Sequence, residues 1–144
     1  MIKNMFGKKR NLIVLIVIFV GVTIYIIARG GMRSPYSLSV ANETISVTGD
    51  NEYSFSLPMQ DIASIELTQI QDYGTCIEGS SDRSHICGVY ENTAFGRYDL
   101  WIIKKIKSAI VVTDKTGHVC VLNYENERST NELYKALNEM INKN

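Results

Sequence analysis

Two short segments of the chain repeat one pairing of reactive residue types. His85 stands two residues before Cys87, and His118 stands two residues before Cys120. Because residues i and i+2 of a β-strand share a face, each pair could present two zinc ligands on one side of a strand. Cys76 brings the number of such ligands to five, but close pairs of the Cys-x-x-Cys type are missing. We therefore favour a small buried thiol at Cys120 and a turn-capping His118 over a zinc site, and we predict no metal or cofactor.

The same thiols and histidines are also compatible with a nucleophilic enzyme. A sortase-type transpeptidase, for example, needs a cysteine, a histidine and a positioned arginine in a larger barrel. Only Thr75 and Cys76 match the Thr-x-Thr-Cys stretch that would support this class. A phosphate-binding loop, a Gly-x-Ser-x-Gly elbow and a His-Glu-x-x-His zinc motif are missing as well. The sequence therefore favours a protein without enzymatic activity, with a thiol-dependent or zinc-binding enzyme as the less favoured alternative.

Lys104, Lys105 and Lys107 form a basic cluster between two predicted strands. Each lysine near an anionic membrane surface would contribute about 1 kcal/mol, so the cluster could contact lipid headgroups. A solvated hairpin end that protects a sheet edge is the simpler interpretation, and we favour it. Residues 34–144 carry nine basic and fifteen acidic side chains, a net charge of −6. Because nucleic acids bind to basic surfaces, this balance argues against a nucleic-acid partner.

The N-terminal part of the chain is a predicted membrane anchor. Residues 11–28 (NLIVLIVIFVGVTIYIIA) contain no charged side chain. As a helix they would span about 27 Å, close to the hydrocarbon thickness of a bilayer. A cleaved signal peptide would have a shorter apolar core followed by small residues, whereas bulky residues continue here almost to Arg29. We therefore predict a basic tail at 1–10, a transmembrane helix in the lipid bilayer at 11–28, a linker at 29–35 and a separate domain at 36–144.

Basic residues are more frequent before this predicted helix than after it. The positive-inside tendency then places the N-terminus in the cytoplasm and the domain outside, as a single-pass protein of the cell membrane. Disulfides form readily in that environment. If residues 76–87 are a hairpin with its loop at 80–83, Cys76 lies opposite Cys87, close enough for a disulfide. Three unlinked thiols in a cytoplasmic domain are the alternative.

The pattern of the domain predicts short strands followed by one helix. Apolar and polar residues alternate between turn signals in the segments 37–40, 44–48, 53–57, 62–70, 97–103, 109–113 and 119–123. Residues 72–88 are polar and contain glycines. Ser129 and Glu132 match a capping box that would begin a helix at Ser129. We expect that helix to bury an apolar face on the sheets, formed by Leu133, Leu137, Met140 and Ile141.

The order of these elements resembles the bacterial pleckstrin-homology-like (PH-like) domain family, whose members are small and often membrane-tethered. The similarity covers roughly residues 36–141. It rests on the segments YSLSV, TISV, YSFSLPMQDIASIEL, FGRYDLWI and IVVTDKTGHVCVLN before the final helix, and on the spacing of Leu57, Ile62 and Ile65. It implies a mainly β fold with one C-terminal α-helix. In that fold two nearly orthogonal antiparallel sheets form a barrel-like sandwich, which the helix closes at one end.

The resemblance implies no enzymatic activity, and it does not extend to inositol lipids. Eukaryotic relatives bind phosphoinositides through basic residues in the first hairpin loop, which here is Ala-Asn-Glu at 41–43. Two hypotheses about function remain. The first is a membrane-anchored, non-enzymatic interaction module whose sheet edge or open end binds a protein, a peptide, or a wall or lipid component. The second is a structural accessory subunit of a membrane complex. We favour the first, because the predicted anchor has few small residues for helix association: Gly21, Thr23 and Ala28.

Overall fold

The computed structural model describes residues 35–49 and 53–143. The chain divides into two units, residues 1–33 and 34–144, and every described element belongs to the second unit. The predicted basic tail, the predicted transmembrane helix and most of the linker lie outside the described residues. Within the described ranges, no helix is both long and apolar enough to cross a bilayer.

Three strands form a small antiparallel sheet in the order β1-β2-β3. They are β1 (Tyr36–Ala41), β2 (Thr44–Gly49) and β3 (Ser54–Pro58), and a short 3₁₀ turn, η1 (Met59–Asp61), follows. Asn42 and Glu43 both adopt positive φ, at 50° and 56°, in the two-residue turn between β1 and β2. This backbone matches the twist of a tight hairpin, and Asn42 is a residue type that favours it, whereas Glu43 is not.

Six strands form the larger sheet in the order β4-β8-β9-β7-β6-β5. They are β4 (Ile62–Gln69), β5 (Thr75–Ser81), β6 (His85–Asn92), β7 (Gly96–Ile103), β8 (Ser108–Asp114) and β9 (Val119–Leu122). The expectation of wholly antiparallel sheets is wrong for one pair, because β7 and β9 run parallel. After β7 the chain leaves the place beside β7 in the sheet empty, and β8 pairs with β4. The hairpin return, β9, then fills the gap beside β7 and must run in the same direction as β7.

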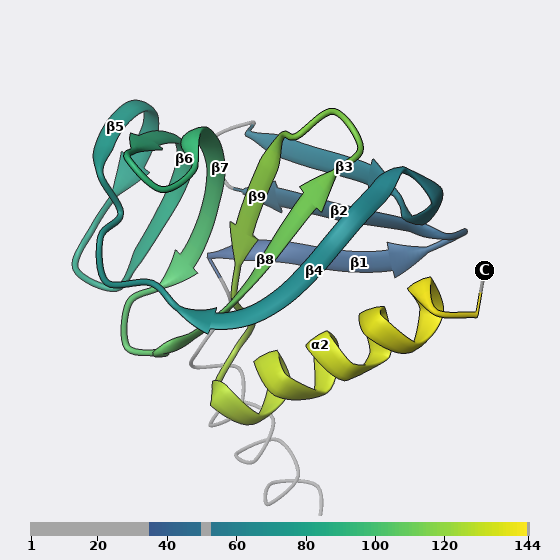
Figure 1. The fold of residues 1–144 in the computed structure, drawn as a ribbon. Coiled ribbons are helices and arrows are strands. Elements are labelled where there is room, and N and C mark those ends of the chain that lie inside the picture. Colours follow the sequence, from purple (N-terminus) through teal and green to yellow (C-terminus); the bar gives the residue numbers. More distant parts are fainter. Residues whose placement is uncertain (1–34, 50–52, 144) are drawn as a thin grey trace, which may run out of the picture. The chain divides into compact units, whose positions relative to one another are not determined.

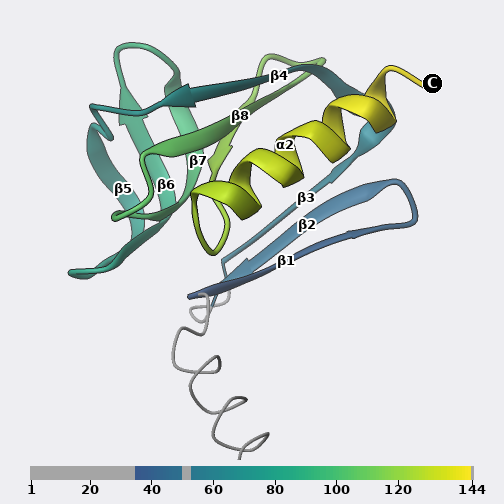
Figure 2. The same cartoon turned by 90° about the horizontal axis from the view of Figure 1, so that it is seen from below.

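The main core lies between the two sheets. Figure 1 shows the strands of the small sheet crossing behind β8 and β9 at a steep angle. The helix α2 (Glu127–Ile141) contacts β4, β8 and η1 and lies beside the gap between the sheets (Figure 2). The mainly β fold with one C-terminal helix is therefore confirmed. The residues that fill this core include Tyr36, Ile45, Val47, Trp101, Ile103, Ile110, Val112, Leu122 and Leu137.

The start of α2 differs from the prediction. Asn126, not Ser129, is the N-cap, and its side-chain oxygen accepts the backbone N–H of Ser129 at 2.9 Å. The predicted capping box is wrong because Glu132 instead binds Arg128, at 2.7 Å. The predicted apolar face is confirmed in part: Leu137 is fully buried, Leu133 and Ile141 pack against the core, and Met140 remains 36% exposed.

The larger sheet is also apolar on its other face. A second cluster of buried side chains occupies that face, and Ile70, Tyr73 and Phe95 pack against it. Figure 1 shows that the sheet is strongly coiled, with β5 and β6 turned away from the plane of β8 and β9. The connection from β4 to β5 and the turn between β6 and β7 therefore lie at the border of this cluster. Its buried members are Ile86, Tyr90, Tyr98, Leu100, Ile102, Ala109, Val111, Val119 and Val121.

Candidate functional site

Both histidines of the repeated His-x-Cys pattern have carboxylate partners. Nε2 of His118 lies 2.5 Å from Oδ2 of Asp99, and its ring stacks on Phe55 with 6.5 Å between the centroids. Nδ1 of His85 lies 2.9 Å from Oδ2 of Asp82, in a different turn. Within residues 35–49 and 53–143, no three His, Cys, Asp or Glu side chains converge as metal ligands would. The two histidines therefore make separate contacts: His118 joins the start of β9 to β7, and His85 lies in the β5–β6 turn.

The three cysteines occupy different environments. Burial, and secondarily the nearby Asp99, raises the pKa of the Cys120 thiol well above its ordinary value, which opposes formation of the nucleophilic thiolate. Cys87 is buried, and its sulfur lies 3.3 Å from the Ser80 hydroxyl. Cys76 is exposed on the edge strand β5. This arrangement gives the buried thiols packing roles.

The predicted register of the Cys76–Cys87 hairpin is wrong. Ser80, not Cys76, lies opposite Cys87, and Cys76 lies opposite Tyr90. All three thiols are free, so the geometric argument for the disulfide is lost. Gly79 and Gly88 decide the register, because a Cβ on Gly79 would lie 2.7 Å from the Cα of Gly88.

The chemistry of the turn fits this shifted register. The Asp82 carboxylate accepts the backbone N–H groups of Ser84 at 2.6 Å and His85 at 2.8 Å. The backbone N–H of Asp82 donates to the carbonyl oxygen of His85 at 3.0 Å. A compact turn at residues 82–85 therefore replaces the predicted loop at 80–83, since the carboxylate satisfies the N–H groups that the turn exposes.

The predicted basic cluster has structural partners. The Lys104 ammonium donates to the Ser81 hydroxyl at 3.1 Å and to the carbonyl oxygen of Asp82. The backbone N–H of Lys107 donates to a carboxylate oxygen of Glu127 at 2.5 Å. These bonds attach the β7–β8 loop to the β5–β6 turn and to the start of α2. The loop is exposed at its three lysines, but it is not the end of a hairpin at a sheet edge, because β9 lies between β7 and β8 and both are interior strands. Contact with headgroups stays a prediction.

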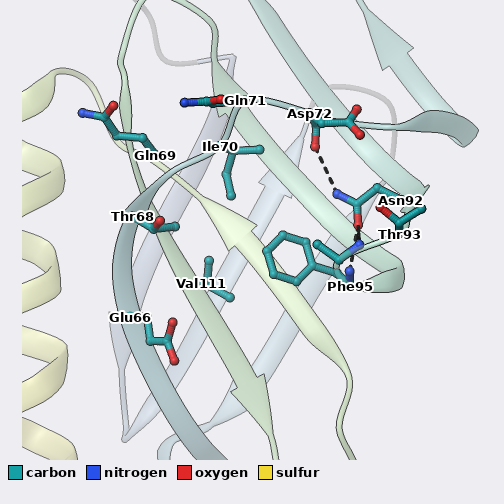
Figure 3. A pocket seen from close by; sticks show the side chains of 11 residues that line it. Glu66, Thr68, Gln69, Ile70, Gln71, Asp72, Asn92, Thr93, Phe95 and Val111 are labelled. Carbon is teal, nitrogen blue, oxygen red and sulfur yellow. Dashed lines mark hydrogen bonds between the residues drawn. The ribbon is translucent and has the colours of Figure 1, made fainter.

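An open cavity of about 380 Å³ lies beside β4, at the border of the second apolar cluster (Figure 3). Three parts of the chain form it: the end of β4 with the residues that follow, the β6–β7 turn, and Val111 of β8. Its described lining residues are Glu66, Thr68, Gln69, Ile70, Gln71, Asp72, Asn92, Thr93, Ala94, Phe95 and Val111.

Asn92 holds the two sides of the cavity together. Its Nδ2 donates to the carbonyl oxygen of Asp72 at 3.0 Å. Its Oδ1 accepts the backbone N–H groups of Ala94 at 3.1 Å and Phe95 at 2.8 Å (Figure 3). Gly74 permits the close approach of these segments, because a Cβ there would lie 2.0 Å from the carbonyl oxygen of Glu91. One amide side chain and one glycine therefore shape the rim.

The inner wall of the cavity is apolar. Figure 3 shows the ring of Phe95 turned toward Val111 and Ile70. The same ring packs edge to face on Tyr98, with 5.2 Å between the centroids. The Tyr98 hydroxyl donates to the carbonyl oxygen of Tyr73 at 2.8 Å, and burial raises its pKa to about 12. Tyr98 therefore stays neutral and supports Phe95 from below.

The rim of the cavity is polar and acidic. Its described lining includes the carboxylates of Glu66 and Asp72 and no lysine or arginine. Five lining side chains make no hydrogen bond to another described residue, so their polar ends can bind a ligand: Glu66, Thr68, Gln69, Gln71 and Thr93. This arrangement can hold a molecule by non-covalent contacts.

Sequence reasoning did not find this cavity. The turn signals were present, because Asp72 precedes Gly74 by two residues and Asn92 begins an Asn-Thr-Ala-Phe-Gly turn. Nothing in the local pattern shows that these two turns meet across about twenty residues of sequence; only the pairing of the strands between them brings them together.

Comparisons with known proteins do not assign a family. No family model matches this chain, and no curated protein or solved structure gives a significant match.

Proposed function

We propose that this protein is a membrane-anchored, non-enzymatic interaction module that binds a ligand in the cavity beside β4. The observation that carries the proposal is the contrast between engaged and free polar groups. Each histidine has a carboxylate partner, and the two buried cysteines have packing roles. The polar ends of Glu66, Gln69 and Gln71, in contrast, are free at an open cavity.

We propose a PH-like architecture for the domain. Two sheets that cross at a steep angle and a C-terminal helix beside the gap between them support this proposal (Figures 1 and 2). The parallel β7–β9 pair departs from the antiparallel pattern that the resemblance implies. The proposal therefore concerns the layering of the domain and the lack of catalytic chemistry that goes with it, and it assigns no ligand.

The membrane part of the proposal rests on residues 11–28, with the domain outside the cell membrane. The chain enters the domain at Tyr36, whose hydroxyl lies 3.1 Å from Oδ1 of Asn123. Nδ2 of Asn123 donates to the carbonyl oxygens of Ile103 at 3.2 Å and Ile106 at 3.4 Å. The loop with Lys104, Lys105 and Lys107 is therefore near the start of the domain. A seven-residue linker extends at most about 25 Å, so we propose that this loop is within reach of anionic headgroups.

Membrane extraction tests the anchor. The full chain should pellet with membranes and resist both high salt and carbonate, because an apolar helix in lipid is held by the hydrophobic effect. A variant that lacks residues 1–30 should appear in the supernatant. Release of the full chain by carbonate would contradict the anchor, and protection of the domain from protease in protoplasts would contradict the proposed topology.

Site-directed photo-crosslinking in intact cells tests the cavity as a binding site. Benzoylphenylalanine in place of Gln71, on the rim, should give a light-dependent adduct. The same substitution at Gln60, an exposed residue of η1 outside the cavity, is the matched control. Equal labelling at both positions, or none at Gln71, would contradict the proposal. Adducts only from residues 11–28 would favour the accessory-subunit hypothesis instead.

A further inference from the structure

We infer that the cavity beside β4 binds an uncharged sugar unit. The inference rests on the proposed function, since it names the ligand class of the same cavity. Three independent properties of the lining lead to it: the mixture of hydrogen-bonding groups, the sign of the charge, and the apolar wall.

The free side chains of the rim can both donate and accept hydrogen bonds. The amides of Gln69 and Gln71 carry two donors and one acceptor oxygen each, and the hydroxyls of Thr68 and Thr93 do both. The Glu66 carboxylate only accepts. A sugar ring carries several hydroxyls that each donate and accept, so it can satisfy such a mixed set. A ligand that only accepts, such as a phosphodiester, would leave the Glu66 carboxylate without a donor.

The charge of the lining excludes anionic ligands. Glu66 and Asp72 contribute carboxylates, and no described lining residue is a lysine or arginine to offset them. Asp72 keeps its place because its Oδ1 accepts the backbone N–H of Gly74 at 2.8 Å. An anion in this cavity would meet like charge without a compensating partner, which is unfavourable. Lipid phosphates therefore do not fit this cavity.

The inner wall fits the apolar face of a ring. Phe95, Ile70 and Val111 form a wall of carbon atoms (Figure 3). The Phe95 ring also packs edge to face on Tyr98. A sugar presents C–H groups on the faces of its ring and hydroxyls at its edge. The sugar ring would pack on Phe95 while its hydroxyls reach the amides and carboxylate of the rim. Ligand pockets typically combine an apolar wall with a few polar groups in this way.

The size of the cavity limits the ligand to a small unit. Its volume of about 380 Å³ is near the lower end of the range for small-molecule sites, roughly 300–1,000 Å³. Glu66, Gln69, Gln71 and Thr93 are all exposed at its rim. A terminal unit or branch of a longer chain could therefore enter while the rest of the polymer stays in solvent.

Calorimetric titration of the purified full chain in detergent tests the inference. The probes are maltotriose, tri-N-acetylchitotriose and galactobiose as neutral sugars, digalacturonate as the acidic counterpart of galactobiose, and inorganic phosphate as an anion. We expect at least one neutral sugar to bind with an affinity that changes little with salt, because no ion pair forms. Digalacturonate and phosphate should bind at least tenfold more weakly.

Variants of exposed residues assign the binding to the cavity. Gln71→Ala and Glu66→Gln should each weaken the sugar at least fivefold, and Glu66→Gln should narrow the difference between galactobiose and digalacturonate. Gln60→Ala and Glu139→Gln, at exposed positions outside the cavity, should change the affinity less than twofold. Matching thermal midpoints would show that all four variants fold.

Three outcomes would overturn the inference: no neutral sugar binds, phosphate binds more tightly than every sugar, or the rim variants bind as well as the parent. A light-dependent adduct at Gln71 combined with failure of all the sugars would remove the ligand class and leave the proposed function standing. If the adduct at Gln71 is absent as well, both the ligand class and the proposed function would be contradicted.

Discussion

The two faces of the six-stranded sheet are both apolar. The polar groups on one face are hydrogen-bonded within the protein, whereas several on the other face are not. On the face toward β1–β3, the buried Tyr36 hydroxyl lies 3.0 Å from the carbonyl oxygen of Trp101, and Asn123 bonds the backbone of Ile103 at the end of β7 and of Ile106 in the β7–β8 loop. Among the described residues, the indole nitrogen of Trp101 is the one buried side-chain polar atom without a partner. On the opposite face, the apolar cluster ends at a cavity with free amides and a free carboxylate.

One face of the sheet therefore contributes to stability, and the other offers groups for binding. Burial raises the pKa of the Tyr36 hydroxyl well above its usual range, so that group stays neutral and serves only to join strands. Buried polar groups are costly unless they are bonded, so the described polar groups of this interior bond one another, with the indole nitrogen of Trp101 as the exception. The rim of the cavity is exposed and can leave such groups unused until a ligand arrives.

The largest expected effect is the loss of packing on the closed face. Leu137→Ala should lower the free energy of unfolding by about 2 to 5 kcal/mol, because Leu137 is fully buried in the core. Lys135→Ala, at an exposed position of the same helix, should cost less than about 0.5 kcal/mol. Urea unfolding followed by tryptophan fluorescence measures both. Equal small effects would mean that α2 does not close this side of the domain.

The next effect concerns the bonded polar groups of that face. Tyr36→Phe keeps the ring but removes the hydroxyl that donates to the buried carbonyl oxygen of Asn123. Asn123 Oδ1 still accepts the backbone N–H of Ile103, and the Trp101 carbonyl oxygen still accepts the backbone N–H of Asn123. We expect a loss of about 1 to 3 kcal/mol in the free energy of unfolding. Tyr134→Phe is the matched control, because the Tyr134 hydroxyl makes no hydrogen bond to a described residue. A neutral Tyr36→Phe variant would contradict the contrast between the faces.

A smaller loss of stability, with a larger loss of binding, is expected at the cavity. Asn92→Ala removes three hydrogen bonds from the rim and should cost about 0.5 to 1.5 kcal/mol in unfolding free energy, since the site is partly solvated. Crosslinking at Gln71 should nevertheless fall severalfold, because the two sides of the cavity lose their common anchor. Asn138→Ala on α2 should leave both measurements unchanged. A variant with normal crosslinking would show that Asn92 does not shape the site.

The smallest expected effect is a pH dependence that belongs to neither face. Hydrogen bonds from the backbone of His85 and Ser84 lower the pKa of Asp82 to about 2 from 3.8. Because the folded state binds this proton less readily than the unfolded state, the stabilising contribution of Asp82 is complete above about pH 4 and is lost as the pH falls toward 2. Urea titrations from pH 5 to pH 2.5 should show a smaller decline for Asp82→Ala than for the parent. Parallel curves would contradict the proposed role of Asp82 in the turn.

Local patterns in the sequence were enough for most of the elements. Alternation around Ile45, Val47 and Leu57 predicted β2 and β3, and the spacing of Leu133 and Leu137 predicted the buried side of α2. These patterns work because each element buries one face, so its own periodicity reports where the core lies. In the polar stretch at 72–88, alternation did not reveal β5 or the first half of β6, since the edge strand β5 buries almost nothing.

The amino-acid sequence by itself determined a mainly β domain with a C-terminal amphipathic helix. Each element buries one face, and the spacing of its apolar residues along the chain shows which face that is. Only the tertiary structure decided the parallel β7–β9 pair, the register of β5 on β6 and the cavity beside β4. Each of these depends on which distant backbone meets which: Gly79 must pass Gly88, and Asn92 must reach the carbonyl oxygen of Asp72. Contacts of this kind are selected by the packing of the whole sheet, and the spacing of neighbouring residues carries no record of them.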